Sequence, residues 1–369
     1  MPYDDRVPSV QDQSHSASEL EVRTHLFDIL ALRCFDAYIS TWILAGLAIH
    51  VSEAPEESYD ADDQVFVRGN LAIDATGVAM RDQPRSFQIA YDELSIGDII
   101  GKGSSSVVLQ ASHKPTGSPI ALKVISMFEK SKRDQLMREI CTLYNASCPS
   151  LISFYGAFYR EGCITIVLEY MDGGSLSNAL SQIGPIPESV LANMTYQTVW
   201  ALAYLKREKR LHRDIKPSNL LINSRGEVKL TDFGVSKELN NSIAMCGTFV
   251  GTFKYMAPER VQSMPYGYSA DIWSLGLCVL ELATGKYPYP INAACIEMVQ
   301  TILESDAPKP PEGKFSTEFE EFIAVCLNKD PKQRVPAELL LQSPWFQNNG
   351  ATSYQQSVAN VASWIASIS

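Results

Sequence analysis

The sequence is short of basic residues, closely spaced cysteines and long apolar runs, and each shortage argues against a class of protein. Lysine and arginine total 31 against 42 acidic residues, and a net charge of −11 argues against a nucleic-acid partner. The 8 cysteines include no C-x-x-C pair, which in a chain of 369 residues predicts reduced thiols. The uncharged apolar segment 37–51 falls short of the roughly 18–20 residues that cross a bilayer. We expect a buried or interfacial helix there, and no membrane partner.

The order of sequence patterns predicts two lobes of different secondary-structure content. Residues 1–91 form an extension that we expect to be partly disordered, since 52–64 is acidic, contains proline and is typical of a linker. From residue 92, three short β-rich runs precede a helical pattern at 130–146 and two further apolar strands. Helical runs then dominate, interrupted by a hairpin at 220–230. The fold class is therefore α+β, with a small β-rich lobe carrying one main helix and a larger α-helical lobe.

A glycine-rich stretch, "GKGSSSVV" at 101–108, lies between the first two predicted strands. Gly101 and Gly103 let the backbone bend closely over a phosphate. A dinucleotide fingerprint would need a helix after the glycines, and a Walker loop would end in G-K-[ST], so neither fits. Ser106 stands where a third glycine is expected. Taken alone, this stretch is equally typical of an ordinary β turn.

Lys123 lies in the apolar strand "IALKV", where an unpaired ammonium group would be costly. Glu139 on the following helix can supply a counter-ion, and nucleotide phosphates can supply another. The alternative is an edge lysine that extends its ammonium group to solvent.

The stretches "HRDIKPSN" (212–219) and "DFG" (232–234) predict a site for phosphoryl transfer. Asp214 can accept the proton of a substrate hydroxyl, and Lys216 can lie beside the γ-phosphate. Asn219 and Asp232 offer the hard oxygen ligands that suit Mg²⁺. These residue types in this order are typical of phosphoryl transfer from ATP.

Residues 92–346 resemble the eukaryotic protein kinases, with "MAPE" (256–259) and "DIWSLG" (271–276) in the expected places. The resemblance implies an ATP site between the lobes, with Leu168 as gatekeeper, and backbone hydrogen bonds from Glu169 and Met171. It also implies a Glu259–Arg334 pair, an Asp271 brace for the catalytic loop, and a stacked column of Leu143, Phe154, His212 and Phe233. The implied nucleotide-contacting residues are Ile100, Gly101, Lys102, Gly103, Ser104, Ser105, Ser106, Val108, Ala121, Lys123, Leu168, Glu169, Met171 and Leu221.

The stretches "EYMDGGSL" (169–176), "FYGAFY" (154–159) and "SIAMCGTFVGTFKYMAPER" (242–260) are similar to the mitogen-activated protein kinase kinases. The five residues between Ser242 and Thr248 resemble the spacing in plant members. The resemblance implies phosphorylation of both hydroxyls by an upstream kinase, and contact of Thr252 with Asp214 and Lys216. It further implies a dual-specificity enzyme that phosphorylates Thr and Tyr of a downstream mitogen-activated protein kinase, in the cytoplasm or nucleus.

The charge of the surrounding segment supports a phosphorylation switch at Ser242 and Thr248 independently of the resemblance. Between the Asp-Phe-Gly and Ala-Pro-Glu motifs the charged residues are Lys237, Glu238 and Lys254, so the unmodified segment is nearly neutral. Phosphates on both hydroxyls would add about −3 to −4, and Arg213 is an available cation.

The tail at 347–369 has an apolar stripe at helical spacing, formed by Tyr354, Val358, Val361, Ile365 and Ile368. It resembles the segment through which these kinases dock their activators, and it equally fits a plain helix packed on the large lobe.

Two other functions stay open for the whole chain, a Ser/Thr kinase one tier upstream and a pseudokinase scaffold.

Overall fold

The computed structural model describes residues 58–60, 65–68, 71–80, 89, 91–103, 106–126, 130–144, 146–232, 254–290 and 295–368. Two compact units make up the chain, residues 1–146 with 153–170 and residues 147–152 with 171–369. The predicted apolar helix at 37–51 lies outside the described residues. No helix in the described ranges is long and apolar enough to cross a membrane.

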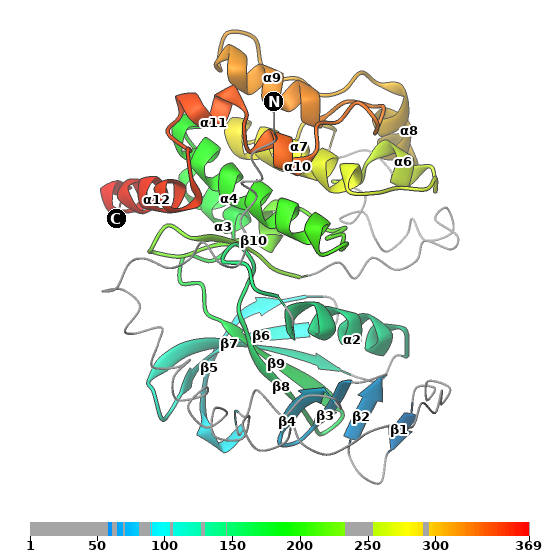
Figure 1. Ribbon diagram of the computed structural model, residues 1–369, viewed down its shortest axis with the longest axis vertical. Coiled ribbons are helices and arrows are strands. Elements are labelled where there is room, and N and C mark those ends of the chain that lie inside the picture. The colour runs from blue at the N-terminus through cyan, green and yellow to red at the C-terminus, as the bar shows by residue number, and fades with distance from the viewer. Residues whose placement is uncertain are drawn as a thin grey trace, which may run out of the picture. The chain divides into compact units, whose positions relative to one another are not determined.

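The first unit contains a five-stranded antiparallel sheet in the order β5-β6-β7-β9-β8 (Figure 1). Its helix α2 (Lys130–Tyr144) lies between the third and fourth of these strands in sequence, so the predicted order of three strands, a helix and two strands is confirmed. The strands are β5 (Leu94–Lys102), β6 (Ser106–His113), β7 (Ser118–Ser126), β8 (Phe154–Arg160) and β9 (Cys163–Glu169).

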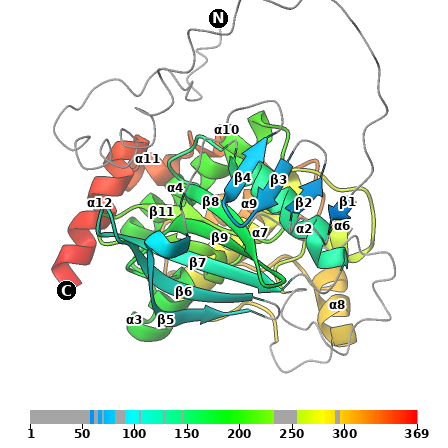
Figure 2. The ribbon, with the colours of Figure 1, turned by 90° about the horizontal axis from the view of Figure 1, so that it is seen from below.

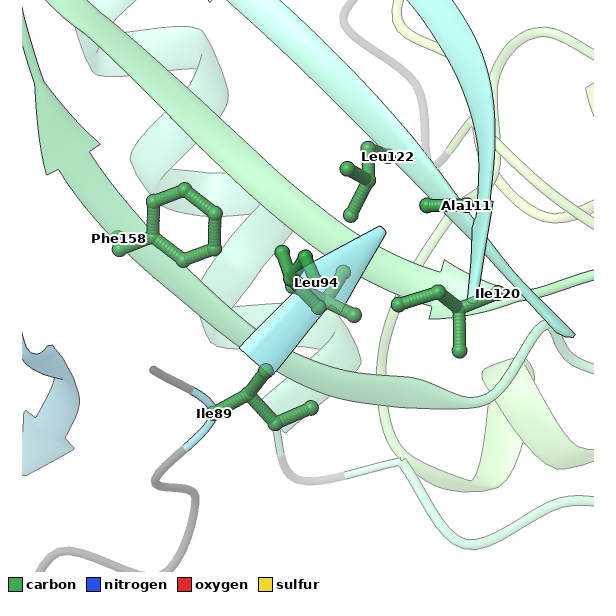
Figure 3. Close-up of a cluster of buried hydrophobic side chains, with 7 residues drawn as sticks. Ile89, Leu94, Ala111, Ile120, Leu122 and Phe158 are labelled. Carbon is green, nitrogen blue, oxygen red and sulfur yellow. The ribbon is translucent and has the colours of Figure 1, made fainter. Parts of the chain in front are cut away.

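The sheet buries apolar side chains in a cluster that Figure 3 shows. Leu122 and Phe158 are each 1% exposed, and Tyr91 of the 3-10 helix η1 (Tyr91–Glu93) packs edge-on against Phe158. The cluster consists of Ile89, Leu94, Ala111, Ile120, Leu122, Phe158 and Val167. At roughly 1.5–3 kcal/mol for each large side chain, this burial is a major stabilising contribution to the unit.

A second sheet, which the sequence did not predict, precedes the first. Its strands β1 (Ser58–Asp60), β2 (Val65–Arg68), β3 (Leu71–Asp74) and β4 (Gly77–Met80) pair in chain order, and β3 and β4 lie against β8 (Figures 1 and 2). Leu71, Ile73 and Val78 are at most 1% exposed. The extension therefore includes ordered strands, and β1 lies within the segment 52–64, for which the composition predicts a linker. The strands are too short for alternation to stand out among polar residues.

The second unit is mainly helical, as predicted. Helices α4 (Glu188–Arg207) and α7 (Ser269–Thr284) are buried along most of their length. The sequence of α7 is apolar on nearly all sides, whereas α4 also buries polar residues such as Asn193 and Gln197. The hairpin at 220–230 is present as β10 (Leu220–Ile222) and β11 (Val228–Leu230), preceded by the 3-10 helix η2 (Pro217–Asn219). The helices are α3 (Leu176–Ile183), α4 (Glu188–Arg207), α6 (Pro258–Val261), α7 (Ser269–Thr284), α8 (Cys295–Glu304), α9 (Thr317–Cys326), α10 (Ala337–Leu340), α11 (Pro344–Asn348) and α12 (Tyr354–Ile368).

Helix α12 packs along α4 (Figure 1). Tyr354 and Val361 of the predicted stripe are buried, Val358 and Ile365 are half-buried, and Ile368 is 52% exposed. Of the two interpretations of the tail, the structure supports a helix packed on the large unit. Its buried side is unavailable to a partner while the helix stays seated.

Candidate active site

In the first unit, Lys123 and Glu139 form the predicted ion pair. Strand β7 places Lys123 and helix α2 places Glu139, with 2.9 Å between Nζ and Oε1. Both residues are under 10% exposed. A buried ammonium group is tolerable only when an opposite charge compensates its lost hydration, so Glu139 also fixes where the ammonium lies.

Strand register brings most of the predicted nucleotide-contacting residues of this unit to one sheet face. Val108 is paired with Gly101 on one side and with Lys123 on the other, and Ala121 is paired with Leu168. Directly paired residues share a face, and Ala121 and Lys123 share one because they are two apart in a strand. Ile100 lies at a register shift and is 46% exposed. The resulting patch is apolar except for one ammonium group.

The glycine-rich loop joins β5 to β6, and Gly103 donates to the carbonyl of Ser106 at 2.8 Å. A Cβ at Gly103 would lie 2.8 Å from Ser106 Oγ, so a larger residue here would require the serine side chain to rotate. Lys102 ends β5 and is exposed, while Ser104 and Ser105 lie outside the described residues.

Glu169 and Met171 are predicted to offer backbone hydrogen bonds, and they differ in whether their amides already have a partner. The amide of Glu169 donates to the carbonyl of Ser153 at 2.9 Å, so a nucleotide cannot also take that amide. The carbonyl of Met171 accepts from Gly174 at 3.1 Å, and among the described residues its amide has no partner. Leu221 lies in β10 and bridges to Ser175.

The second unit gathers the predicted catalytic residues in one loop. Lys216 Nζ lies 2.7 Å from Asp214 Oδ2, and Asn219 Nδ2 donates to the same oxygen at 3.0 Å and to the Asp214 carbonyl at 2.8 Å. The carboxylate of Asp214 is about one third exposed, with a side-chain value of 31%. It is therefore oriented by two donors and still open to a substrate hydroxyl.

Asp271 of α7 braces this loop, as predicted. Its two carboxylate oxygens accept from the amides of His212 and Arg213, each at 2.8 Å. The φ of Arg213 is 72°, a left-handed conformation that costs a non-glycine residue about 1 kcal/mol or more. His212 is fully buried, and its Nε2 lies 3.0 Å from the Thr231 carbonyl. Burial lowers the pKa of His212 below its ordinary value.

Asn219 and Asp232 flank the β10–β11 hairpin at its open end, and the amide of Thr231 donates to the Asn219 carbonyl at 3.0 Å. Because the Asn219 amide nitrogen faces Asp214, its amide oxygen is the atom left for a cation. Asp232 has a φ of 60° and is half-buried. An amide oxygen and a carboxylate fit a hard divalent cation.

The predicted Glu259–Arg334 pair is also present. It is bidentate, at 2.7 and 2.8 Å, and both side chains are at most 5% exposed. Of the predicted column, Leu143 and Phe154 are buried in the first unit and His212 in the second. Phe233, Ser242, Thr248 and Thr252 lie outside the described residues.

Sequence reasoning missed Arg260, which follows Glu259 directly and is 3% exposed. Its Nη1 donates to the carbonyl of Arg213 at 2.7 Å. The two guanidinium carbons lie over the ring of Tyr266, 5.9 Å from the centroid for Arg213 and 5.1 Å for Arg260. The sequence holds no signal for this contact, since the two arginines are 47 residues apart.

Comparison of the sequence with known proteins identifies the family of this chain. Residues 94–346 match the family described as "Protein kinase domain". The chain is 46% identical over 287 residues to "Mitogen-activated protein kinase kinase 3" of Arabidopsis thaliana, covering 77% of this chain and 54% of that protein. It is 41% identical over 317 residues to "Mitogen-activated protein kinase kinase 2" of the same plant, covering 81% and 86%. It is 40% identical over 275 residues to "Dual specificity mitogen-activated protein kinase kinase dSOR1" of Drosophila melanogaster, covering 67% and 69%.

The domain match confirms the α+β bilobal kinase fold, and with it an enzyme that binds ATP together with a divalent metal. The relatives narrow the class of protein kinase further, because their similarity extends over most of the chain. The chain belongs to the mitogen-activated protein kinase kinase family of protein kinases.

Proposed function

We propose that this kinase transfers the γ-phosphate of ATP to Thr and Tyr in the activation loop of a downstream mitogen-activated protein kinase. The observation that carries the proposal is the Asp214 carboxylate, oriented by Lys216 and Asn219 in a loop braced from α7. Dual specificity is supported by the name of one relative, the Drosophila kinase. The substrate class is supported by the family to which the chain belongs.

Each residue has a role that its surroundings allow. Asp214 would accept the proton of the attacking hydroxyl, and Lys216 would offset the charge that develops on the transferred group. Lys123, held by Glu139, would orient the α- and β-phosphates. Asn219 and Asp232 would hold Mg²⁺, which would neutralise the negative charge of the phosphates.

We propose further that phosphorylation of Ser242 and Thr248 by an upstream kinase switches the enzyme on. The support is a pair of arginines that lack a counter-ion. Nε of Arg213 and Nε of Arg260 are both buried without a hydrogen-bond partner, and no carboxylate in the described part of the chain pairs with either guanidinium. Arg260 is buried and Arg213 is half-buried, and two neighbouring like charges favour binding of an anion; a phosphate carries about −1.5 to −2.

The substrate proposal is tested with protein activated by co-expression with an active upstream kinase. It is incubated with Mg-ATP and a panel of catalytically inactive mitogen-activated protein kinases, and mass spectrometry locates the phosphates. We expect both Thr and Tyr of one activation loop to be modified. Modification of Ser or Thr alone, without Tyr, would favour the Ser/Thr kinase alternative. No transfer to any protein would favour the scaffold.

The switch is tested with the wild type, Ser242→Ala/Thr248→Ala and Ser242→Asp/Thr248→Asp. The double alanine variant should not be activated, and the double aspartate variant should be partly active without an upstream kinase, since a carboxylate carries less charge than a phosphate. Ser305→Ala/Thr352→Ala, at two exposed hydroxyl positions, is the matched control. Normal activation of the double alanine variant would place the switch elsewhere.

A further inference from the structure

The turn of the β10–β11 hairpin is pressed against the backbone of the C-terminal helix. Gly226 lies in this turn with a φ of +80°, and its amide donates to the Asn223 carbonyl at 3.0 Å. A Cβ added at Gly226 would lie closer than 3.0 Å to three backbone atoms of α12, namely Val358 O, Ala362 N and Ala362 Cα. Backbone atoms cannot move aside as a flexible side chain does. Only glycine therefore fits between the turn and α12.

Helix α4 holds the same turn from another direction. Gln197, fully buried in α4, donates from Nε2 to the Gly226 carbonyl at 3.0 Å and accepts the Val228 amide at Oε1, at 2.8 Å. A buried amide bonded at both ends resists displacement, because moving the hairpin would leave buried polar groups unpaired. The turn is thus fixed between a side chain of α4 and the backbone of α12.

Helix α12 is in turn anchored on α4 rather than on the hairpin alone. The ring of Tyr354 lies 5.8 Å from that of Trp200, and Asn360 Nδ2 donates to Asn193 Oδ1 at 3.0 Å. Val361 is 0% exposed. The position of α12 is therefore determined by contacts that do not involve the hairpin.

The other end of the hairpin carries the two candidate metal ligands. Its ladder has three residue pairs, from Ile222↔Val228 to Leu220↔Leu230, and the Thr231 amide extends it to the Asn219 carbonyl. Three residues of strand span about 10 Å. A paired ladder this short is stiff, so a displacement at Gly226 is transmitted to Asn219 and Asp232.

We infer that α12 is a positioning element of the kinase reaction, and that it acts through Gly226 on the hairpin that presents Asn219 and Asp232. Seating of α12 sets the place of the turn, and the turn sets where the hairpin presents the two ligands. Gly226 and α12 touch no reacting atom. The inference rests on the proposed role of Asn219 and Asp232 as metal ligands.

The decisive variant is Gly226→Ala in the full chain, with Gly313→Ala as matched control. Gly313 has a φ of +67° and no atom within 4 Å of an added Cβ, so both variants strain the backbone while only Gly226→Ala collides with α12. Mn²⁺ is titrated by electron paramagnetic resonance in the presence of a non-hydrolysable ATP analogue. We expect the apparent Mn²⁺ dissociation constant to rise about ten-fold in Gly226→Ala, as for other residues that orient metal ligands, and to stay unchanged in the control.

Hydrogen exchange supplies a readout that does not depend on the metal. In Gly226→Ala without nucleotide, the Thr231 amide should exchange faster than in Gly313→Ala. Val361→Ala, which loosens α12 without changing any residue of the hairpin, should shift both readouts in the same direction by a smaller factor. This variant decides the question if Gly226→Ala does not fold.

Equal Mn²⁺ affinity and equal Thr231 exchange in Gly226→Ala and Gly313→Ala would overturn the inference. So would a Val361→Ala protein that matches the wild type in both readouts. If the wild type itself binds no Mn²⁺ with the analogue, the proposed metal ligands are wrong, and the exchange experiment alone decides whether α12 positions the hairpin.

Discussion

Buried charged side chains of the site are held by specific partners, which is what makes their positions reproducible. Lys123 has Glu139, Arg334 has Glu259 through two parallel hydrogen bonds, and Asp271 accepts from two backbone amides. Removing one member of such a pair leaves an uncompensated buried charge, at about 3–5 kcal/mol. Asp214 differs, because it is partly exposed and carries the proposed chemistry.

Replacing Asp214 by Asn should lower kcat by about two to four orders of magnitude, because the amide cannot accept the hydroxyl proton. ATP affinity should change little, since Asp214 is proposed to act on the hydroxyl rather than on the nucleotide. Steady-state kinetics with a protein substrate measures kcat, and calorimetry measures nucleotide binding. Asp98→Asn, at an exposed position of β5, is the control. Near wild-type turnover in Asp214→Asn would contradict the catalytic assignment.

The lowered pKa of His212 predicts a pH dependence of stability. Below the ordinary pKa of 6.5, the unfolded chain takes up a proton at this residue while the folded protein keeps the imidazole neutral. The free energy of unfolding should therefore fall as pH drops below about 6.5, with a limit of about 1.4 kcal/mol per pH unit for one proton. Urea unfolding of the wild type and His212→Gln between pH 7.5 and 5.5 measures the difference. Identical slopes would exclude His212 as the source.

At the scale of elements, α12 depends on packing more than on its own sequence. It has no charged residue, hence no charge pairs along its surface and none that favour its ends. Its stability must come from the side that faces α4, where Tyr354, Ser357 and Val361 are buried.

Val361→Asp should therefore destabilise the second unit by about 3–5 kcal/mol, because the carboxylate would be buried without a partner. Ser363→Asp, on the exposed side of the same helix, should change stability by no more than about 0.5 kcal/mol. Chemical denaturation of both variants gives the comparison. Equal stability of the two would mean that α12 is not part of the core and is available for docking.

At the scale of the whole molecule, each unit has its own buried core, and the first extends to residues that precede the kinase domain match. Ile73→Ala should cost about 2–5 kcal/mol and should speed hydrogen exchange in β3, β4 and β8. Ala75→Ser, at an exposed position of the β3–β4 turn, should have little effect. If exchange in β8 is unchanged by Ile73→Ala, the small sheet does not stabilise the first unit.

Much of the fold could be predicted because its signals are local. The strand, helix and hairpin patterns of 92–346 each lie within a short window, and the catalytic residues lie in one loop and one hairpin. The β1–β4 sheet escaped prediction because its strands of 3–4 residues are bounded by polar turns, as at Asp74, whose carboxylate accepts from the Thr76 and Gly77 amides. The tail could be predicted as a helix with an apolar stripe, but not whether that stripe packs on the large unit or is used for docking.

Residues close together in the chain are enough to identify the chemistry of this protein. The spacing of Asp214, Lys216 and Asn219 within one loop is enough to predict phosphoryl transfer, since those contacts depend on chain geometry alone. The distant residues that support them can be recognised only in the folded protein. The stacking of Arg213 and Arg260 on Tyr266, and the closeness of Gly226 to Val358 and Ala362, join segments far apart in the chain. Such contacts follow from how helices and strands pack, and no local pattern encodes them.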